Sequence, residues 1–101
     1  MCGIFGYIGK KQDASTSILE GLKSLEYRGY DSWGMALKTS SGDVVIEKQP
    51  RKIGDVQAPD VESSMGIGHT RWATHGGISK ANTHPHTDCS GNVIIVHNGI
   101  V

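Results

Sequence analysis

The sequence lacks an excess of either charge, any long apolar run and any dense set of cysteines. Lys and Arg together number 10, as do Asp and Glu, so no basic surplus is available to bind nucleic acid or an anionic membrane. No apolar stretch approaches the roughly 20 residues that a membrane-spanning helix needs, and the N-terminus has no secretory signal pattern. These absences predict a soluble, cytoplasmic protein with no nucleic-acid or membrane partner.

Cysteine is scarce, and the two present, Cys2 and Cys89, match neither a zinc-ribbon nor a disulfide spacing. We expect both to be free thiols. The five histidines allow a metal hypothesis, in which His84 and His86 form a chelating pair joined by His75 or Cys89. The regular spacings of structural zinc sites are absent, so the sequence favours ordinary loop histidines and predicts neither a metal nor a cofactor.

Glycine, by contrast, is abundant, with 14 residues of 101 against an average usage of about 7%. It gathers beside polar and reactive residues, in Cys2-Gly3, Arg28-Gly29, His75-Gly76-Gly77 and Asn98-Gly99. Such clustering indicates main chain that approaches a ligand closely. The length allows at most one small domain.

Hydrophobic patterning predicts a mixed domain of strands and one helix. A strand over 4–8 begins almost at the terminus, and a helix begins after Asp13, its expected N-cap, and ends near Gly29. Strands over 33–37 and 44–48 are expected to form a hairpin. Residues 49–64 are weakly patterned, with a short helix expected near Ile53 and Val56. Further strands are expected over 65–70 and 93–96, with a loop over 76–86. No helix follows to cover a second face of the sheet, so we expect a truncated domain.

Cys2 is the first candidate for catalysis. Cysteine is small enough for the preceding Met1 to be removed, so the mature chain would begin with a thiol. A free α-amino group has a pKa of about 7.7–8.0 and can take the proton of the neighbouring thiol as a general base. One residue would then supply both nucleophile and base. Position alone equally allows Cys2 to be a small buried apolar residue.

Two further segments carry groups that such a nucleophile needs. Asn98-Gly99 offers a side-chain amide donor and an unobstructed main-chain N–H for an oxyanion, although the same dipeptide is common in turns. In the polar stretch 69–77, Arg71 could bind a carboxylate and Trp72 could wall a small-molecule site, with Gly76-Gly77 as the hinge of a lid. A surface loop is the alternative for this stretch.

Four motifs in order carry a resemblance to a known family: MCGIFG at 1–6, LEYRGYDS at 25–32, GHTRWATHG at 68–76 and HNG at 97–99. Together they resemble the glutaminase domain of glutamine–fructose-6-phosphate aminotransferases. The first motif is shared by all amidotransferases with an N-terminal cysteine. The second favours the hexosamine enzymes over the amidophosphoribosyltransferase and asparagine synthetase types, which stay open as alternatives.

The resemblance implies a fold and a set of roles. The fold is that of the N-terminal-nucleophile hydrolases, an α+β four-layer α/β/β/α sandwich with two mainly antiparallel sheets, of which residues 1–101 would be the N-terminal part. Cys2 would attack the side-chain amide of glutamine while Asn98 and the Gly99 N–H hold the oxyanion. The resemblance assigns substrate binding to Arg71, Trp72, Thr74 and His75, and support of the nucleophile to Arg28 and Gly29.

The resemblance also implies partners. Glutamine would be converted to glutamate and ammonia through a cysteinyl thioester. A sugar-isomerase domain of the same polypeptide would use the ammonia to make glucosamine 6-phosphate from fructose 6-phosphate, and the full-length enzyme would be a homodimer. The rest of the glutaminase domain and the isomerase domain are absent from these residues. A non-catalytic fragment that acts as a binding module is therefore the competing hypothesis.

Overall fold

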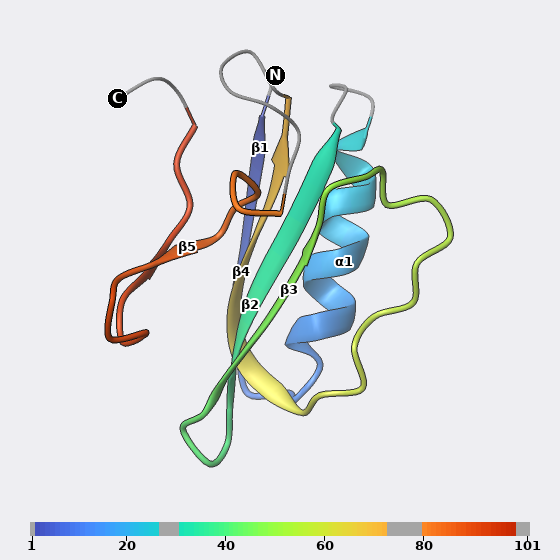
Figure 1. The fold of residues 1–101 in the computed structure, drawn as a ribbon. Helices are drawn as coiled ribbons and strands as arrows, with labels where there is room; N and C mark the ends of the chain where they lie inside the picture. The colour runs from blue at the N-terminus through green and yellow to red at the C-terminus, as the bar shows by residue number, and fades with distance from the viewer. Residues whose placement is uncertain (1, 27–30, 73–79, 99–101) are drawn as a thin grey trace.

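Four strands form one antiparallel sheet, and a helix covers one face of it (Figure 1). The computed structural model describes residues 2–26, 31–72 and 80–98. In chain order the elements are β1 (Gly3–Ile8), α1 (Ala14–Ser24), β2 (Ser32–Thr39), β3 (Val44–Gln49), β4 (Ser63–Arg71), β5 (His86–Thr87) and β6 (Ile94–Ile95). The sheet has the order β1-β4-β2-β3, and β5 pairs with β6 separately. The predicted α+β class with an antiparallel sheet is confirmed.

β4 is an inner strand, because β1 pairs with one of its edges and β2 with the other. The β1 register runs from Gly3 opposite Thr70 to Ile8 opposite Met65. Side chains alternate between the two faces of a strand. The even-numbered residues of β4 face α1, where Gly66 and Gly68 meet the helix, and the odd-numbered residues face the opposite side. One face of β4 therefore packs against α1, and the other faces away from the helix.

The helix packs closely on β4 because two glycines lie beneath it. A Cβ added at Gly66 or Gly68 would lie 2.6 or 2.5 Å from the side chain of Ile18. Ile18 and Leu22 of the helix are fully buried, as is Trp33 of β2. Burial of a large apolar side chain contributes about 1.5–3 kcal/mol, so this layer is the core of the domain.

The start of the helix agrees with the sequence prediction, but its capping does not. The helix begins after Asp13, whose side chain makes no capping hydrogen bond. Its Oδ1 instead accepts the hydroxyl hydrogen of Tyr7 at 2.8 Å. The helix ends at Ser24, and the expected terminator Gly29 lies outside the described residues. Among the described residues no helix has the length and hydrophobicity of a membrane span.

The short helix predicted near Ile53 and Val56 is wrong. The segment forms a turn, in which the Val56 N–H donates to the Ile53 carbonyl oxygen at 3.2 Å. Ile53 is only 1% exposed and belongs to the core cluster, and Val56 packs against that cluster. The apolar spacing that suggested a helix therefore reflects two residues of an irregular segment that pack against the core.

The predicted hairpin is confirmed as β2 and β3, and the strand predicted over 65–70 lies within β4. The strand predicted over 93–96 is reduced to Ile94–Ile95, and His86, at the end of the predicted loop, pairs in β5. A two-residue ladder gives these β-branched residues little cross-strand packing, so only part of the predicted segment forms a strand.

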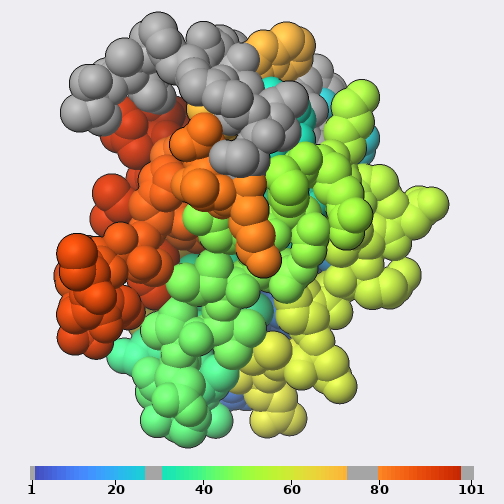
Figure 2. Space-filling model, viewed as in Figure 1, coloured from blue at the N-terminus to red at the C-terminus, as the bar shows by residue number. Residues whose placement is uncertain are grey.

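Residues 80–98 lie on the side of the sheet opposite α1 (Figure 1). In the space-filling view their orange atoms lie against the green atoms of β3 (Figure 2). The two come close at Gly34 of β2, where an added Cβ would collide with the carbonyl oxygen of His84. Beside this contact Thr83 and Pro85 are fully buried. Gly34 thus lets the main chain of this segment rest directly on the sheet.

Gly34→Ala should lower the free energy of unfolding by about 1–3 kcal/mol, because the added methyl group would collide with the main-chain carbonyl of His84. Gly6→Ala is the matched control on β1. The nearest atom to its added Cβ is the Gly66 carbonyl oxygen at 3.9 Å, so we expect a change within about 0.5 kcal/mol. Urea unfolding followed by tryptophan fluorescence measures both variants. Equal losses would contradict the proposed contact.

Candidate functional site

Cys2 lies at the end of the sheet where β1 begins and β4 ends. Its Sγ accepts the main-chain N–H of Trp72 at 3.4 Å and lies 3.9 Å from the Trp72 carbonyl oxygen. This contact follows from the β1–β4 register, which pairs Gly3 with Thr70 and so brings the next residues together. Cys2 is a half-buried free thiol. The predicted nucleophile is held by the sheet and remains partly accessible.

Asn98 approaches the same point from the segment that follows β6. Its Nδ2 donates to the Cys2 carbonyl oxygen at 3.2 Å, and its Oδ1 lies 2.8 Å from Nε2 of His69. The structure therefore brings together two of the predicted catalytic residues, Cys2 and Asn98. The third, Gly99, lies outside the described residues.

Arg71 is the last residue of β4, and Trp72 follows it. Arg71 is two residues from His69, so it lies on the face of β4 that looks toward residues 80–98. Trp72 contacts Cys2 through its main chain, while its side chain is 48% exposed and free to wall an adjacent site. The other predicted substrate-binding and supporting residues lie outside the described residues: Thr74, His75, Arg28 and Gly29.

Three histidines form a row on this face. The ring centroids of His69 and His84 are 4.1 Å apart with nearly parallel planes, and those of His84 and His86 are 4.3 Å apart. His84 is also fixed by the His97 main-chain N–H, which donates to its Nδ1 at 3.3 Å. The row therefore links β4, β5 and the segment that carries Asn98.

Burial keeps this row uncharged at neutral pH. Loss of hydration lowers the pKa of His69 to about 4, although the hydrogen bond to Asn98 opposes the shift. Burial, reinforced by the charges of the neighbouring histidines, also lowers the pKa of His84 to about 4. The pKa of His86 is lowered by burial and by nearby Lys48. Neutral rings can stack closely where charged rings would repel.

The metal hypothesis centred on His84 and His86 receives no third ligand from the described residues. Within them, no group of three or more His, Cys, Asp or Glu side chains is placed to hold a metal ion. Of the two additions considered from the sequence, Cys89 is exposed and His75 lies outside the described residues.

The residue that sequence reasoning missed is His69. It lies within the motif at 68–76, yet no role followed from its position in the sequence. The available indication was its spacing of two from Arg71, which places both residues on one face of a strand. Its contact with Asn98 joins positions 29 residues apart and depends on the path of residues 80–98.

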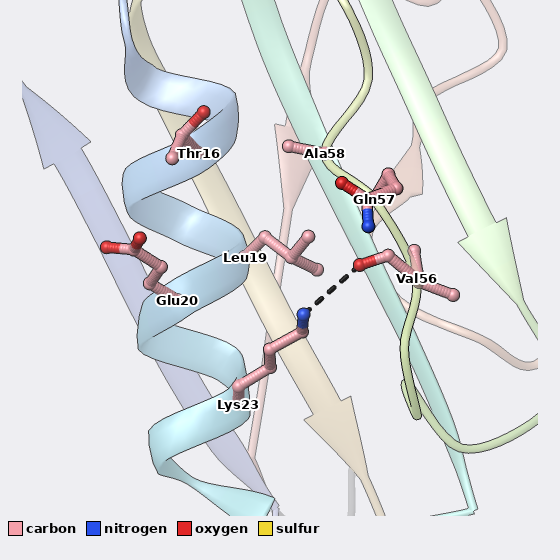
Figure 3. A pocket seen from close by; sticks show the side chains of 7 residues that line it. All are labelled: Thr16, Leu19, Glu20, Lys23, Val56, Gln57 and Ala58. Carbon is pink, nitrogen blue, oxygen red and sulfur yellow. Dashed lines mark hydrogen bonds between the residues drawn. The ribbon is translucent and has the colours of Figure 1, made fainter.

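A pocket of about 310 Å³ lies elsewhere, between α1 and the segment 56–58 (Figure 3). Lys23 reaches across it, and its Nζ donates to the Val56 carbonyl oxygen at 3.1 Å. The lining residues are Thr16, Leu19, Glu20, Lys23, Val56, Gln57 and Ala58. None of them is a predicted site residue, so this pocket is separate from the surroundings of Cys2.

Fold and site together describe an α+β protein with a thiol, an asparagine amide and an arginine at one end of an antiparallel sheet. Comparison with known proteins matches the whole chain, at about 50% identity, to the N-terminal part of glutamine–fructose-6-phosphate aminotransferases (isomerizing) of many species. The resemblance carried by the four motifs is thereby confirmed.

The relatives include the proteins of Pyrococcus horikoshii, Halobacterium salinarum and Geobacillus kaustophilus, each 51% identical over 105, 102 and 104 residues respectively. Each match covers 100% of this chain and 17% of the relative, so the chain spans about a sixth of the length of the curated relatives it matches. No family model matches the chain.

The histidine row predicts how stability depends on pH. The folded pKa of about 4 lies below the ordinary value of 6.5 for His69 and His84, so the unfolded chain binds more protons between these values. The free energy of unfolding should be highest above pH 6.5 and fall toward pH 4, by on the order of 1 kcal/mol per pH unit. The half-exposed His84 contributes the smaller share because solvent screens it.

Urea unfolding between pH 7 and pH 5, above the range of ordinary carboxylates, measures this slope. A variant that combines His69→Phe with His84→Phe keeps the stacked rings and removes the titration, so its slope should be much flatter. Equal slopes in the parent and the variant would show that these two histidines are not the titrating groups.

Proposed function

We propose that these residues form the N-terminal part of a glutaminase domain, which releases ammonia from the side-chain amide of glutamine. The observation that carries the proposal is the meeting of Cys2 and Asn98, 96 residues apart in sequence, at one end of the sheet. The names of the relatives support glutamine as the nitrogen donor. Because the chain spans 17% of those relatives, the complete activity is proposed for a full-length polypeptide.

The proposed reaction begins once Met1 has been removed, when the α-amine of Cys2 takes the proton of its own thiol. The thiolate attacks the carbon of the glutamine amide, and a C–S bond forms. Asn98 Nδ2 and the Gly99 N–H donate to the resulting oxyanion. The C–N bond then breaks, and the proton on the amine leaves with ammonia. Water attacks the thioester and yields glutamate and the free thiol.

The substrate would lie beside Cys2 at the end of the sheet, next to Arg71, the last residue of β4. The Arg71 guanidinium presents a fork of donors that suits the α-carboxylate of glutamine. The half-exposed side chain of Trp72 would form a wall beside it. Thr74 and His75 would complete the pocket and its mobile cover. Arg28 and Gly29 would support the nucleophile from the loop after α1.

We propose the four-layer N-terminal-nucleophile hydrolase fold for the complete domain. Apolar side chains on the face of the sheet opposite α1 support a further layer there. Ile8 is 81% exposed, Ile4 45%, Met65 40% and Ile46 37%. Clustered exposure of this kind marks a surface that another element covers, and a second sheet would do so.

The ammonia would serve synthesis of glucosamine 6-phosphate from fructose 6-phosphate by a sugar-isomerase domain of the same cytoplasmic, homodimeric polypeptide. The relatives' names support fructose 6-phosphate over the acceptors of amidophosphoribosyltransferase or asparagine synthetase. The thioester route uses only protein groups and water, so the proposal includes no metal or cofactor.

The experiment uses a full-length hybrid, in which this chain replaces the matching residues of the Geobacillus kaustophilus relative. Cys2→Ala should reduce glutamine hydrolysis by at least about 10³-fold, because the variant lacks the thiol that lies beside Asn98 and forms the thioester in the proposed reaction. Cys89→Ser is the matched control and should stay within about twofold of the parent, since Cys89 is exposed and is not among the described residues that contact Cys2 or Asn98. Glutamate release and glutamine binding are both measured.

Comparable losses in the two variants would mean that Cys2 is not the nucleophile. A parent hybrid that binds glutamine in calorimetry but releases no glutamate would instead support the binding-module hypothesis.

A further inference from the structure

His69 and Asn98 make a contact that the proposed reaction does not by itself require. Nε2 of His69 lies 2.8 Å from Oδ1 of Asn98, while Nδ2 of the same amide donates to the Cys2 carbonyl oxygen at 3.2 Å. Each end of the carboxamide therefore has its own partner.

These partners define which way the amide points. A carboxamide nitrogen only donates and its oxygen only accepts. The Cys2 carbonyl oxygen is an acceptor, so it selects Nδ2, and Oδ1 must then face His69. It follows that Nε2 of His69 carries the hydrogen and donates it to Asn98. Turning the amide over would set two acceptor oxygens, Oδ1 and the Cys2 carbonyl, against each other.

The other ring nitrogen agrees with this assignment. Nδ1 of His69 is buried and has no hydrogen-bond partner within the described part of the chain. A buried acceptor without a partner is tolerated better than a buried N–H without one. With hydrogen on Nε2, only the acceptor Nδ1 is left unpaired. With hydrogen on Nδ1, a buried N–H would have no partner and the hydrogen bond to Asn98 would be lost.

His69 is well placed to act as a fixed reference for a mobile group. It is 0% exposed, belongs to an inner strand and stacks on His84 at 4.1 Å. Asn98, by contrast, is exposed in a segment without regular structure beyond β6. Oxyanion donors help catalysis only when they are oriented before the reaction. A rigid donor that holds Oδ1 supplies this orientation.

We propose that His69 is a positioning residue, whose Nε2–H holds the Asn98 carboxamide with Nδ2 turned toward Cys2. The inference rests on the proposed function, since it concerns the amide assigned to the oxyanion. His69 contacts no reacting atom. It acts through Asn98, and its effect should appear where the oxyanion forms.

Two substitutions separate the hydrogen bond from the packing of the ring. His69→Phe keeps an aromatic ring against His84 and removes the donor. In the full-length hybrid it should lower kcat for glutamine hydrolysis by about 10-fold or more and change KM by less than about threefold, because the oxyanion exists only near the transition state. His69→Gln loses the ring but carries an N–H near the position of Nε2. It should retain kcat within about threefold of the parent.

Asn98→Ala, alone and combined with His69→Phe, completes the test. If His69 acts through Asn98, the double variant should be no slower than Asn98→Ala. If the loss of kcat in the double variant equals the product of the two single losses, the inference is overturned. It is also overturned if His69→Gln is as slow as His69→Phe, because that result would point to ring packing. If Asn98→Ala lowers kcat and His69→Phe does not, the positioning role alone fails. If Asn98→Ala leaves kcat unchanged, its oxyanion role in the proposed function fails.

A measurement without activity covers the case in which a variant does not fold. In this chain labelled with ¹⁵N-histidine, a long-range ¹H–¹⁵N spectrum at neutral pH should show His69 as the Nε2–H tautomer, assigned in the parent chain by the proximity of its ring to that of His84. The Nδ1–H tautomer would overturn the inference.

Discussion

The pairing of β1 with β4 is the constraint on which the rest of the site depends. Its register sets Gly3 opposite Thr70, and the Cys2 sulfur then lies at the Trp72 N–H just beyond the paired residues. A slip of one residue would send every side chain of β1 to the other face of the sheet. Cys2 would then face α1 instead of Asn98. The close packing of Phe5 of β1 on Gly21 of α1 opposes such a slip, because the slip would turn Phe5 away from the helix.

The same inner strand serves structure and chemistry on its two faces. The glycines on one face admit the helix and form the core, while His69 and Arg71 on the other face look toward residues 80–98. The contact of the His84 carbonyl with Gly34 fixes that segment on the sheet. A site composed of groups from distant parts of the sequence therefore has a rigid base, which a preorganised oxyanion site requires.

The features that depend on local sequence pattern were predicted from the sequence. The hairpin, the first strand and the start of the helix followed from period and turn chemistry, and the motif around Cys2 and that around Asn98 identified the two residues that meet. The Ile53 and Val56 helix was wrong because apolar spacing does not distinguish a helical face from two separate anchors. The histidine row could not be predicted, since it depends on how residues 80–98 cross the sheet, and no spacing in the sequence encodes that path.

The account depends most on Cys2 as a nucleophile that uses its own amine. Glutamine is added to the full-length hybrid with Met1 removed, the reaction is stopped with acid, and the N-terminal peptide is examined by mass spectrometry. The account predicts a γ-glutamyl adduct on the peptide that carries Cys2, and no adduct when Met1 is retained, because an amide nitrogen cannot accept the thiol proton. An adduct of equal abundance in both forms, or one on the Cys89 peptide, would contradict it.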